Sequence, residues 1–111
     1  MQPAKLDIVQ EPSSNGTLVV RLTGKLSLET VNGFLQEMRP NPAEKLVLDM
    51  SGVSYLDSAG VGALVQLFVH RRGQTKKMAM AALTSQGAAV MQVAGLTKLI
   101  PVFPTVEEAS A

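Results

Sequence analysis

The sequence contains no cysteine and no tryptophan, and only one histidine among its 111 residues. Without cysteine the chain can form neither a disulfide nor a thiolate zinc site, and it has no cysteine nucleophile, which fits a reducing compartment such as the cytosol. One histidine is too few for a histidine-based metal cluster. We therefore expect no metal ion and no cofactor.

An excess of charge of one sign is also missing. Ten basic and nine acidic side chains give a net charge of +1, whereas nucleic acid and anionic membranes usually require a concentrated basic face. The densest basic run, His70-Arg71-Arg72, stands at the end of an expected helix, where cations complement the helix dipole and Gly73 can cap the helix. We interpret this run as structural and expect no nucleic-acid partner.

Long apolar runs are missing too, because Gln66, His70 and the glycines interrupt every candidate before it reaches the roughly 20 residues of a membrane-spanning helix. The first ten residues, MQPAKLDIVQ, lack the apolar block of a signal peptide. Both observations favour a cytoplasmic protein without membrane insertion.

Enzyme motifs do not occur either. Gly60-Val61-Gly62 lacks the later glycine or lysine of a phosphate-binding loop. A hydrolytic serine needs a base within hydrogen-bond distance, and the only imidazole, His70, lies about 18 Å from Ser58 along one expected helix, at 1.5 Å per residue. We expect that the chain is not an enzyme.

The composition is that of an ordinary globular domain, with 46% hydrophobic and 17% charged residues. At this length we expect a single domain over residues 1–111 that can bury one core without disulfides.

The stretch from Lys45 to Leu67 predicts a strand, a loop and a helix. Residues 46–48 form an apolar run of the length of a buried strand, which we expect to end near Met50 because the turn-forming pair Ser51-Gly52 follows. Asp49, close to the end of this strand, is expected to bond loop amides and to support the loop.

Asp57 is the expected N-cap of the following helix, with Ser58 at its first position and its hydroxyl offered to solvent. Asp49 and Asp57 could also suggest a divalent-metal site, but two carboxylates without a further acidic cluster make a poor one. The helix is predicted from apolar residues that recur at helical spacing, namely Val61, Leu64, Val65, Phe68 and Val69.

Gly60 and Gly62 are unexpected in a helix, where each costs about 1 kcal/mol relative to alanine. They would either leave the first turn bare, so that a partner's backbone can approach Ser58, or let the helix pack tightly on its own sheet. Local sequence favours the second reading without excluding the first.

The N-terminal part predicts a β-hairpin. The first strand is indicated by apolar residues that alternate with polar ones, namely Ala4, Leu6 and Ile8. A turn is indicated at residues 12–16, which include Ser14, and a second strand at residues 17–23, which are rich in strand formers and end before Gly24. Ser27 is then predicted to cap a helix that ends at residues 40–42 and whose apolar face comprises Leu28, Val31, Leu35 and Met38.

The C-terminal part continues the alternation. Residues 77–83 are predicted as a strand buried on both faces, and Thr84 or Ser85 as the cap of a helix that ends before Gly95. Residues 99–103 predict a strand, and the proline within it indicates a strand at the edge of the sheet. Thr105 and Glu108 have the spacing of a capping box, which predicts a final helix. Met78, Met80 and Met91 are expected to fill the core. The result is an α/β domain with a mixed β-sheet, helices packed against it, and the order β-β-α-β-α-β-α-β-α.

The run LVLDMSGVSYLDSAGVGALVQL closely resembles the central signature of STAS domains, in particular of bacterial anti-sigma factor antagonists, in which a D-S-x-G loop carries the phosphorylated serine. Ser58 falls on that serine. Weaker matches extend over residues 18–109, among them Gly95-Leu96 and a closing helix at residues 106–109. Lys25 and Ser27 replace the acidic residues of the family's G-E-L-D turn, so the resemblance does not identify the partner.

The resemblance implies a regulator of transcription in the bacterial stress response. Unphosphorylated, it would bind an anti-sigma factor that is also a serine kinase and so free the sigma factor. Phosphorylation of Ser58 by that kinase would end the contact, and a serine phosphatase would restore it. The implied partner-binding residues are Ser27, Ser54, Asp57, Ser58, Ala59, Gly60 and Gly62.

Two alternatives remain at this point. Similar STAS domains serve as constitutive subunits of lipid or anion transporter complexes, in which the serine need not be phosphorylated. A third reading is a docking part of a larger multi-protein stress-signalling assembly.

Overall fold

The computed structural model describes residues 5–13 and 15–111. Ala4 and Ser14, which the sequence assigns to a strand and a turn, lie outside the described residues.

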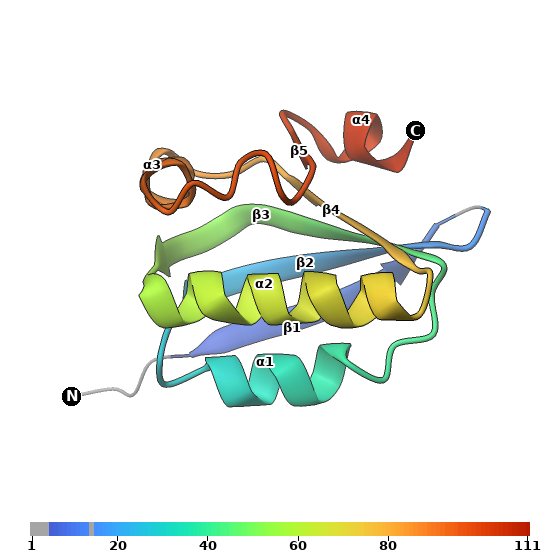
Figure 1. Ribbon diagram of the computed structural model, residues 1–111, viewed down its shortest axis with the longest axis horizontal. Helices are drawn as coiled ribbons and strands as arrows, with labels where there is room; N and C mark the ends of the chain where they lie inside the picture. Colours follow the sequence, from blue (N-terminus) through green and yellow to red (C-terminus); the bar gives the residue numbers. More distant parts are fainter. Residues whose placement is uncertain (1–4, 14) are drawn as a thin grey trace.

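Secondary-structure elements follow one another in the predicted order (Figure 1). The sheet has the strand order β1-β2-β3-β4-β5, in which β1 and β2 are antiparallel and the other neighbours are parallel, so it is mixed, as predicted. The elements are β1 (Leu6–Pro12), β2 (Thr17–Leu26), α1 (Val31–Met38), β3 (Lys45–Leu56), α2 (Ser58–Gly73), β4 (Lys77–Ala81), α3 (Ser85–Val93), β5 (Val102–Phe103) and α4 (Val106–Ser110).

The sheet separates two apolar clusters. Figure 1 shows α1 and α2 together on one face and α4 across the sheet from them. The larger cluster joins α1, α2 and α3 to the sheet, and the smaller one lies under α4. β4 contributes to both, because Met78 and Met80 belong to the first cluster and Ala79 and Ala81 to the second. The predictions that β4 is buried on both faces and that Met78, Met80 and Met91 fill the core are confirmed.

The predicted end of the central strand is wrong. β3 does not stop near Met50 but continues through Ser51 and Gly52 to Leu56, paired with β2 over its whole length. Gly52 lies against β2 rather than in a turn: an added Cβ would come within 2.7 Å of the Leu22 carbonyl oxygen and 2.9 Å of Thr23 Oγ1. The glycine therefore permits a close approach of two strands.

The first helix starts later than predicted. Gly24 does not end β2, which runs on to Leu26 with register shifts. Thr30, not Ser27, precedes the first helical residue, because residues 27–30 form a turn in which the Ser27 amide donates to Thr30 Oγ1 at 3.0 Å. Leu28 lies in this turn and is 73% exposed, so it is not part of the core, whereas Phe34 is buried and was missed.

Further caps mostly agree with the sequence. Thr84 and Thr105 cap α3 and α4 through hydrogen bonds of 3.1 Å from the amides of Gly87 and Glu108. Gly73 is not the cap of α2 but its last residue, since Gln74 takes the C-cap position. The last strand is shorter than expected, only Val102–Phe103, and lies at the sheet edge, as predicted. In the described part of the chain, no helix is both long enough and apolar enough to span a bilayer.

Candidate functional site

The ends of β2 and β3 meet the start of α2 at Asp57. Asp57 Oδ1 accepts a hydrogen bond of 2.8 Å from the Gly60 amide, and Oδ2 accepts one of 3.1 Å from the Leu28 amide. The Asp57 amide donates to the Leu26 carbonyl at 3.4 Å. Asp57 therefore caps α2, as predicted, and in addition fixes the turn between β2 and α1 to the start of this helix.

Ser58 is the first residue of α2 and is exposed. In the described chain the amides of Ser58 and Ala59 make no hydrogen bond, as is usual for the first turn of a helix. The dipole of the 16-residue helix favours negative charge at this end. The dipole would therefore favour a negatively charged group on Ser58, although such a group would stand next to the Asp57 carboxylate.

The two glycines of this turn have different reasons to be there. Gly60 is buried, and an added Cβ would collide with the Leu26 carbonyl oxygen and lie 2.7 Å from Leu56 Cδ1. At Gly62 an added Cβ would meet nothing within 4 Å. Gly60 thus lets α2 pack against its own sheet, while Gly62 leaves the outer surface near the start of the helix without a projecting side chain.

Gln86 holds the residue before Asp57 from the other side. Its Oε1 accepts a hydrogen bond of 2.9 Å from the Leu56 amide, and its Nε2 donates one of 2.8 Å to the Leu56 carbonyl. This contact could not be predicted from the sequence, because a glutamine in the first turn of a helix does not reveal a partner on another element.

A groove of about 490 Å³ lies between α2 and α3 and has Ser58 in its lining. Val93 on α3 is 90% exposed and belongs to the apolar lining of this groove, and a continuous apolar surface of this kind is typical of a contact surface. None of the described residues that line the groove is charged. Besides Ser58, the groove is lined by Val61, Gly62, Val65, Val90, Val93, Ala94 and Leu96.

The remaining predicted site residues differ in their access. Ser54 is exposed, and its hydroxyl donates to the Gly24 carbonyl at 3.1 Å. Ser27 is only 7% exposed and so offers little surface to a partner. Its role in partner binding stays a prediction, and its burial argues against that role.

Asp49 lies within β3, and its Oδ1 accepts hydrogen bonds from the amide and the hydroxyl of Ser51 at 3.0 and 2.8 Å. Its Oδ2 lies 3.5 Å from Arg21 Nε. These contacts do not reach residues 57–60, because β3 continues beyond Asp49 instead of ending there.

Chemically, the site presents a hydroxyl on a rigid turn beside an apolar groove. Within residues 5–13 and 15–111 no hydrogen bond joins Ser58 to a basic side chain, and no three His, Asp or Glu residues are grouped to hold a metal ion. The arrangement suits a hydroxyl that receives a group from another protein, together with a surface that the other protein can cover.

Comparisons with known proteins find matches over most of the chain. The STAS domain model matches residues 9–109. The anti-sigma F factor antagonist of Paenibacillus polymyxa is 24% identical in an alignment of 92 positions that covers 79% of each chain.

Solved structures have the same fold. An anti-sigma factor antagonist from Mycobacterium paratuberculosis has a TM-score of 0.85 at 23% identity, with 96% of this chain and 92% of that chain covered. The anti-sigma factor antagonist SpoIIAA of Bacillus has TM-scores of 0.78 in its unphosphorylated form and 0.71 in its phosphorylated form, both at 20% identity, with 94% of this chain and 93% and 96% of those chains covered.

Proposed function

This chain belongs to the STAS domain family, and from that premise we propose that it is an anti-sigma factor antagonist whose partner binding is switched by phosphorylation of Ser58. The unphosphorylated chain binds an anti-sigma factor that is also a serine kinase and thereby frees the sigma factor. The kinase transfers the γ-phosphoryl group of ATP to Ser58 Oγ, ADP leaves and the hydroxyl proton is released. A serine phosphatase hydrolyses the phosphoester and restores binding.

One observation carries this proposal: the exposed Ser58 lines a groove between α2 and α3 that has no charged residue in its lining. A partner that covers the groove also covers the serine. The position of Ser58 depends on Asp57, whose two carboxylate oxygens are held by the amides of Gly60 and Leu28. Modification therefore changes the contact surface and leaves the scaffold as it is.

The physical effect of a phosphate is large enough for a switch. It adds about −1.5 to −2 charges. The helix dipole and the amides of Ser58 and Ala59 stabilise this charge in the free protein, by up to about 2 kcal/mol. In a complex the same charge would be covered by an apolar surface, and burying a charge without a partner costs several kcal/mol. Since every 1.4 kcal/mol is tenfold in affinity, binding falls by orders of magnitude.

The relatives support the proposal in two ways. The most informative ones carry the name anti-sigma factor antagonist, and SpoIIAA is known in an unphosphorylated and a phosphorylated form on this same fold. In this account the chain is a substrate of a kinase and a phosphatase rather than an enzyme.

Capture of partners from the extract of the native cell tests the proposal. Tagged Ser58→Ala and Ser58→Asp are used as bait, and retained proteins are identified by mass spectrometry. Ser85 provides the matched control, because it is also an exposed first residue of a helix and is likewise preceded by a side-chain cap, Thr84.

We expect Ser58→Ala, Ser85→Ala and Ser85→Asp to retain an ATP-binding serine kinase, and Ser58→Asp to lose it. Equal retention of transporter subunits by both Ser58 variants would contradict the switch and identify a constitutive subunit. Equal retention of one large stress-signalling assembly would contradict it as well.

A further inference from the structure

A second hollow, of about 310 Å³, lies at the other end of α2, between that helix, the start of β4 and the segment that enters β5. Its lining consists of two kinds of residue only. Phe68, Met78, Ala79, Pro101 and Phe103 are apolar, and Lys45, Arg72, Lys76 and Lys77 are cationic. A hollow with an apolar floor and only positive charges fits a ligand that is apolar at one end and negative at the other.

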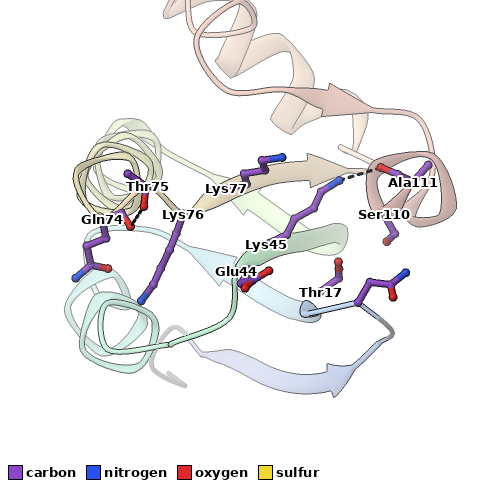
Figure 2. A pocket seen from close by; sticks show the side chains of 10 residues that line it. Thr17, Glu44, Lys45, Gln74, Thr75, Lys76, Lys77, Ser110 and Ala111 are labelled. Atoms are coloured by element: carbon purple, nitrogen blue, oxygen red, sulfur yellow. Dashed lines mark hydrogen bonds between the residues drawn. The ribbon is translucent and has the colours of Figure 1, made fainter.

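The cations are available to such a ligand. In the described part of the chain, no carboxylate lies within ion-pair distance of Arg72, Lys76 or Lys77. The Arg72 guanidinium stands 5.7 Å from the centre of the Phe68 ring, so charge and apolar surface adjoin. Lys45 Nζ donates a hydrogen bond of 3.2 Å to the Ala111 carbonyl oxygen (Figure 2) and is partly engaged.

The shortness of β5 produces the hollow. β4 pairs with β5 only at Met80 and Ala81. Residues 77–79 therefore form an edge of the sheet on that side, although β4 continues to pair with β3 there. A longer β5 would lie over the apolar floor between Phe68 and Phe103, where Phe68 is 8% exposed, Met78 is 3% exposed and Phe103 is half-buried.

A larger neighbouring hollow, of about 550 Å³, shares Lys45, Lys76 and Lys77 but also has Glu44 in its lining. In Figure 2 the Lys45 and Lys77 side chains extend toward α4, whereas Lys76 extends in the opposite direction. Because Glu44 lines the larger hollow and not the smaller one, an anion is favoured in the hollow that Arg72 and Phe68 line.

We propose that the hollow lined by Phe68 and Arg72 binds an amphipathic organic anion, an aliphatic chain of about eight carbons ending in a carboxylate or a phosphate monoester. The volume lies at the lower end of the range of small-molecule sites. The chain would lie on Phe68, Met78 and Phe103, and the head would face the cations. The C-terminal dipole of α2, about half a negative charge, opposes an anion, but the full positive charges of Arg72 and Lys77 outweigh it.

This site is independent of Ser58. Ser58 and Arg72 stand near opposite ends of α2, about 20 Å apart at 1.5 Å per residue. Failure of the phosphorylation switch would leave the ligand site untouched, and the converse also holds.

A titration of the full chain with octanoate and with octyl phosphate, both below their critical micelle concentrations, followed by amide NMR shifts, tests the proposal. Butanoate and 1-octanol serve as the short and the uncharged probes. Arg72→Gln and Lys77→Gln remove exposed cations of the site, and Lys25→Gln is the control, an exposed lysine at the far end of β2. A spectrum like that of the parent protein shows that each variant is folded.

We expect shifts at the amides of residues 77–79 and 102–103. Butanoate should bind at least tenfold more weakly than octanoate, because each buried methylene is worth up to about fourfold. 1-Octanol should also bind at least tenfold more weakly, because it has no negative charge to pair with Arg72 and Lys77. Arg72→Gln and Lys77→Gln should each weaken binding about threefold, and Lys25→Gln should not change it. A stronger response to octanoate or to octyl phosphate identifies the head group.

Three results would overturn the proposal. The first is the absence of a saturable shift with either anion. The second is binding of 1-octanol as tight as that of octanoate. The third is an unchanged affinity for octanoate in the folded double variant Arg72→Gln/Lys77→Gln.

Discussion

The amide of Leu28 donates a hydrogen bond of 3.1 Å to Asp57 Oδ2, which joins the turn before α1 to the residue that precedes Ser58. The other oxygen of the same carboxylate caps α2 through the Gly60 amide at 2.8 Å. One side chain therefore fixes two segments that are far apart in the sequence, and Ser58 is displayed on a rigid turn.

Asp57→Ala should lower the free energy of unfolding by about 2 kcal/mol, because two amides lose their acceptor. Urea unfolding measures this change. Thr84→Ala, which removes a cap that accepts from one amide, is the matched control and should cost about 1 kcal/mol. If the two variants lose the same stability, the bond to Leu28 contributes nothing.

Alanine at the two glycines of α2 should have opposite effects on stability. Gly60→Ala should cost about 3 kcal/mol, because the new methyl group collides with the Leu26 carbonyl oxygen. Gly62→Ala should stabilise the protein by about 0.5 to 1 kcal/mol, since it meets open space and improves helix propensity. Thermal unfolding of both variants tests this, and a Gly60→Ala variant as stable as the parent would refute the close packing of α2.

Much of the fold was predictable because apolar periodicity and turn residues indicated most elements. Residues 77–83 were the exception, since alanine and methionine favour helix and only their place in the alternating order indicated the strand β4. The errors in the strand ends have one physical cause. Gly24 and Gly52 are turn formers by local preference, yet both stand within strands, because pairing between β2 and β3 overrides that preference. Leu28 was assigned to the core by spacing, but the turn at residues 27–30 places it outside the helix.

Val93→Ser should leave stability within about 0.5 kcal/mol of the parent, because the side chain is 90% exposed, and should weaken binding of the captured partner about tenfold. Val69→Ser is the control, an exposed valine of α2 outside the groove with 57% exposure. Calorimetric titration of both variants with the partner measures the effect. Equal affinities would show that the partner does not use the groove.

Arg71 is a buried cation whose role is structural. It is 1% exposed, and its guanidinium donates to the carbonyls of Lys77, Asn41 and Ala43 at 3.0, 3.3 and 2.6 Å. Burial lowers the pKa of Arg71 from its ordinary value, although an arginine stays charged at neutral pH.

Arg71→Met should therefore cost about 3 kcal/mol, since three carbonyls lose a charged donor. The neighbouring Arg72→Met should change stability by no more than about 0.5 kcal/mol, because Arg72 is exposed. Chemical denaturation compares the two, and equal losses would mean that the buried bonds are not stabilising.

The site was less predictable than the fold. The spacing of Asp57 and Ser58 before an apolar periodic segment indicated the cap and the exposed serine. Three features were not accessible from sequence: the bond from Leu28, the two bonds from Gln86, and the groove with α3. Each of them joins elements that only the folded sheet brings together. Asp49 was assigned to the loop because β3 was predicted too short.

The central claim is that a phosphate on Ser58 abolishes partner binding without changing the fold. The most direct test is the dissociation constant of the captured kinase for the unphosphorylated chain and for the same chain phosphorylated at Ser58, with amide NMR spectra of both. We expect affinity to fall at least about 100-fold, which corresponds to about 2.7 kcal/mol, while shift changes stay confined to residues near the start of α2. Equal dissociation constants, or a spectrum changed throughout the sheet, would contradict the account.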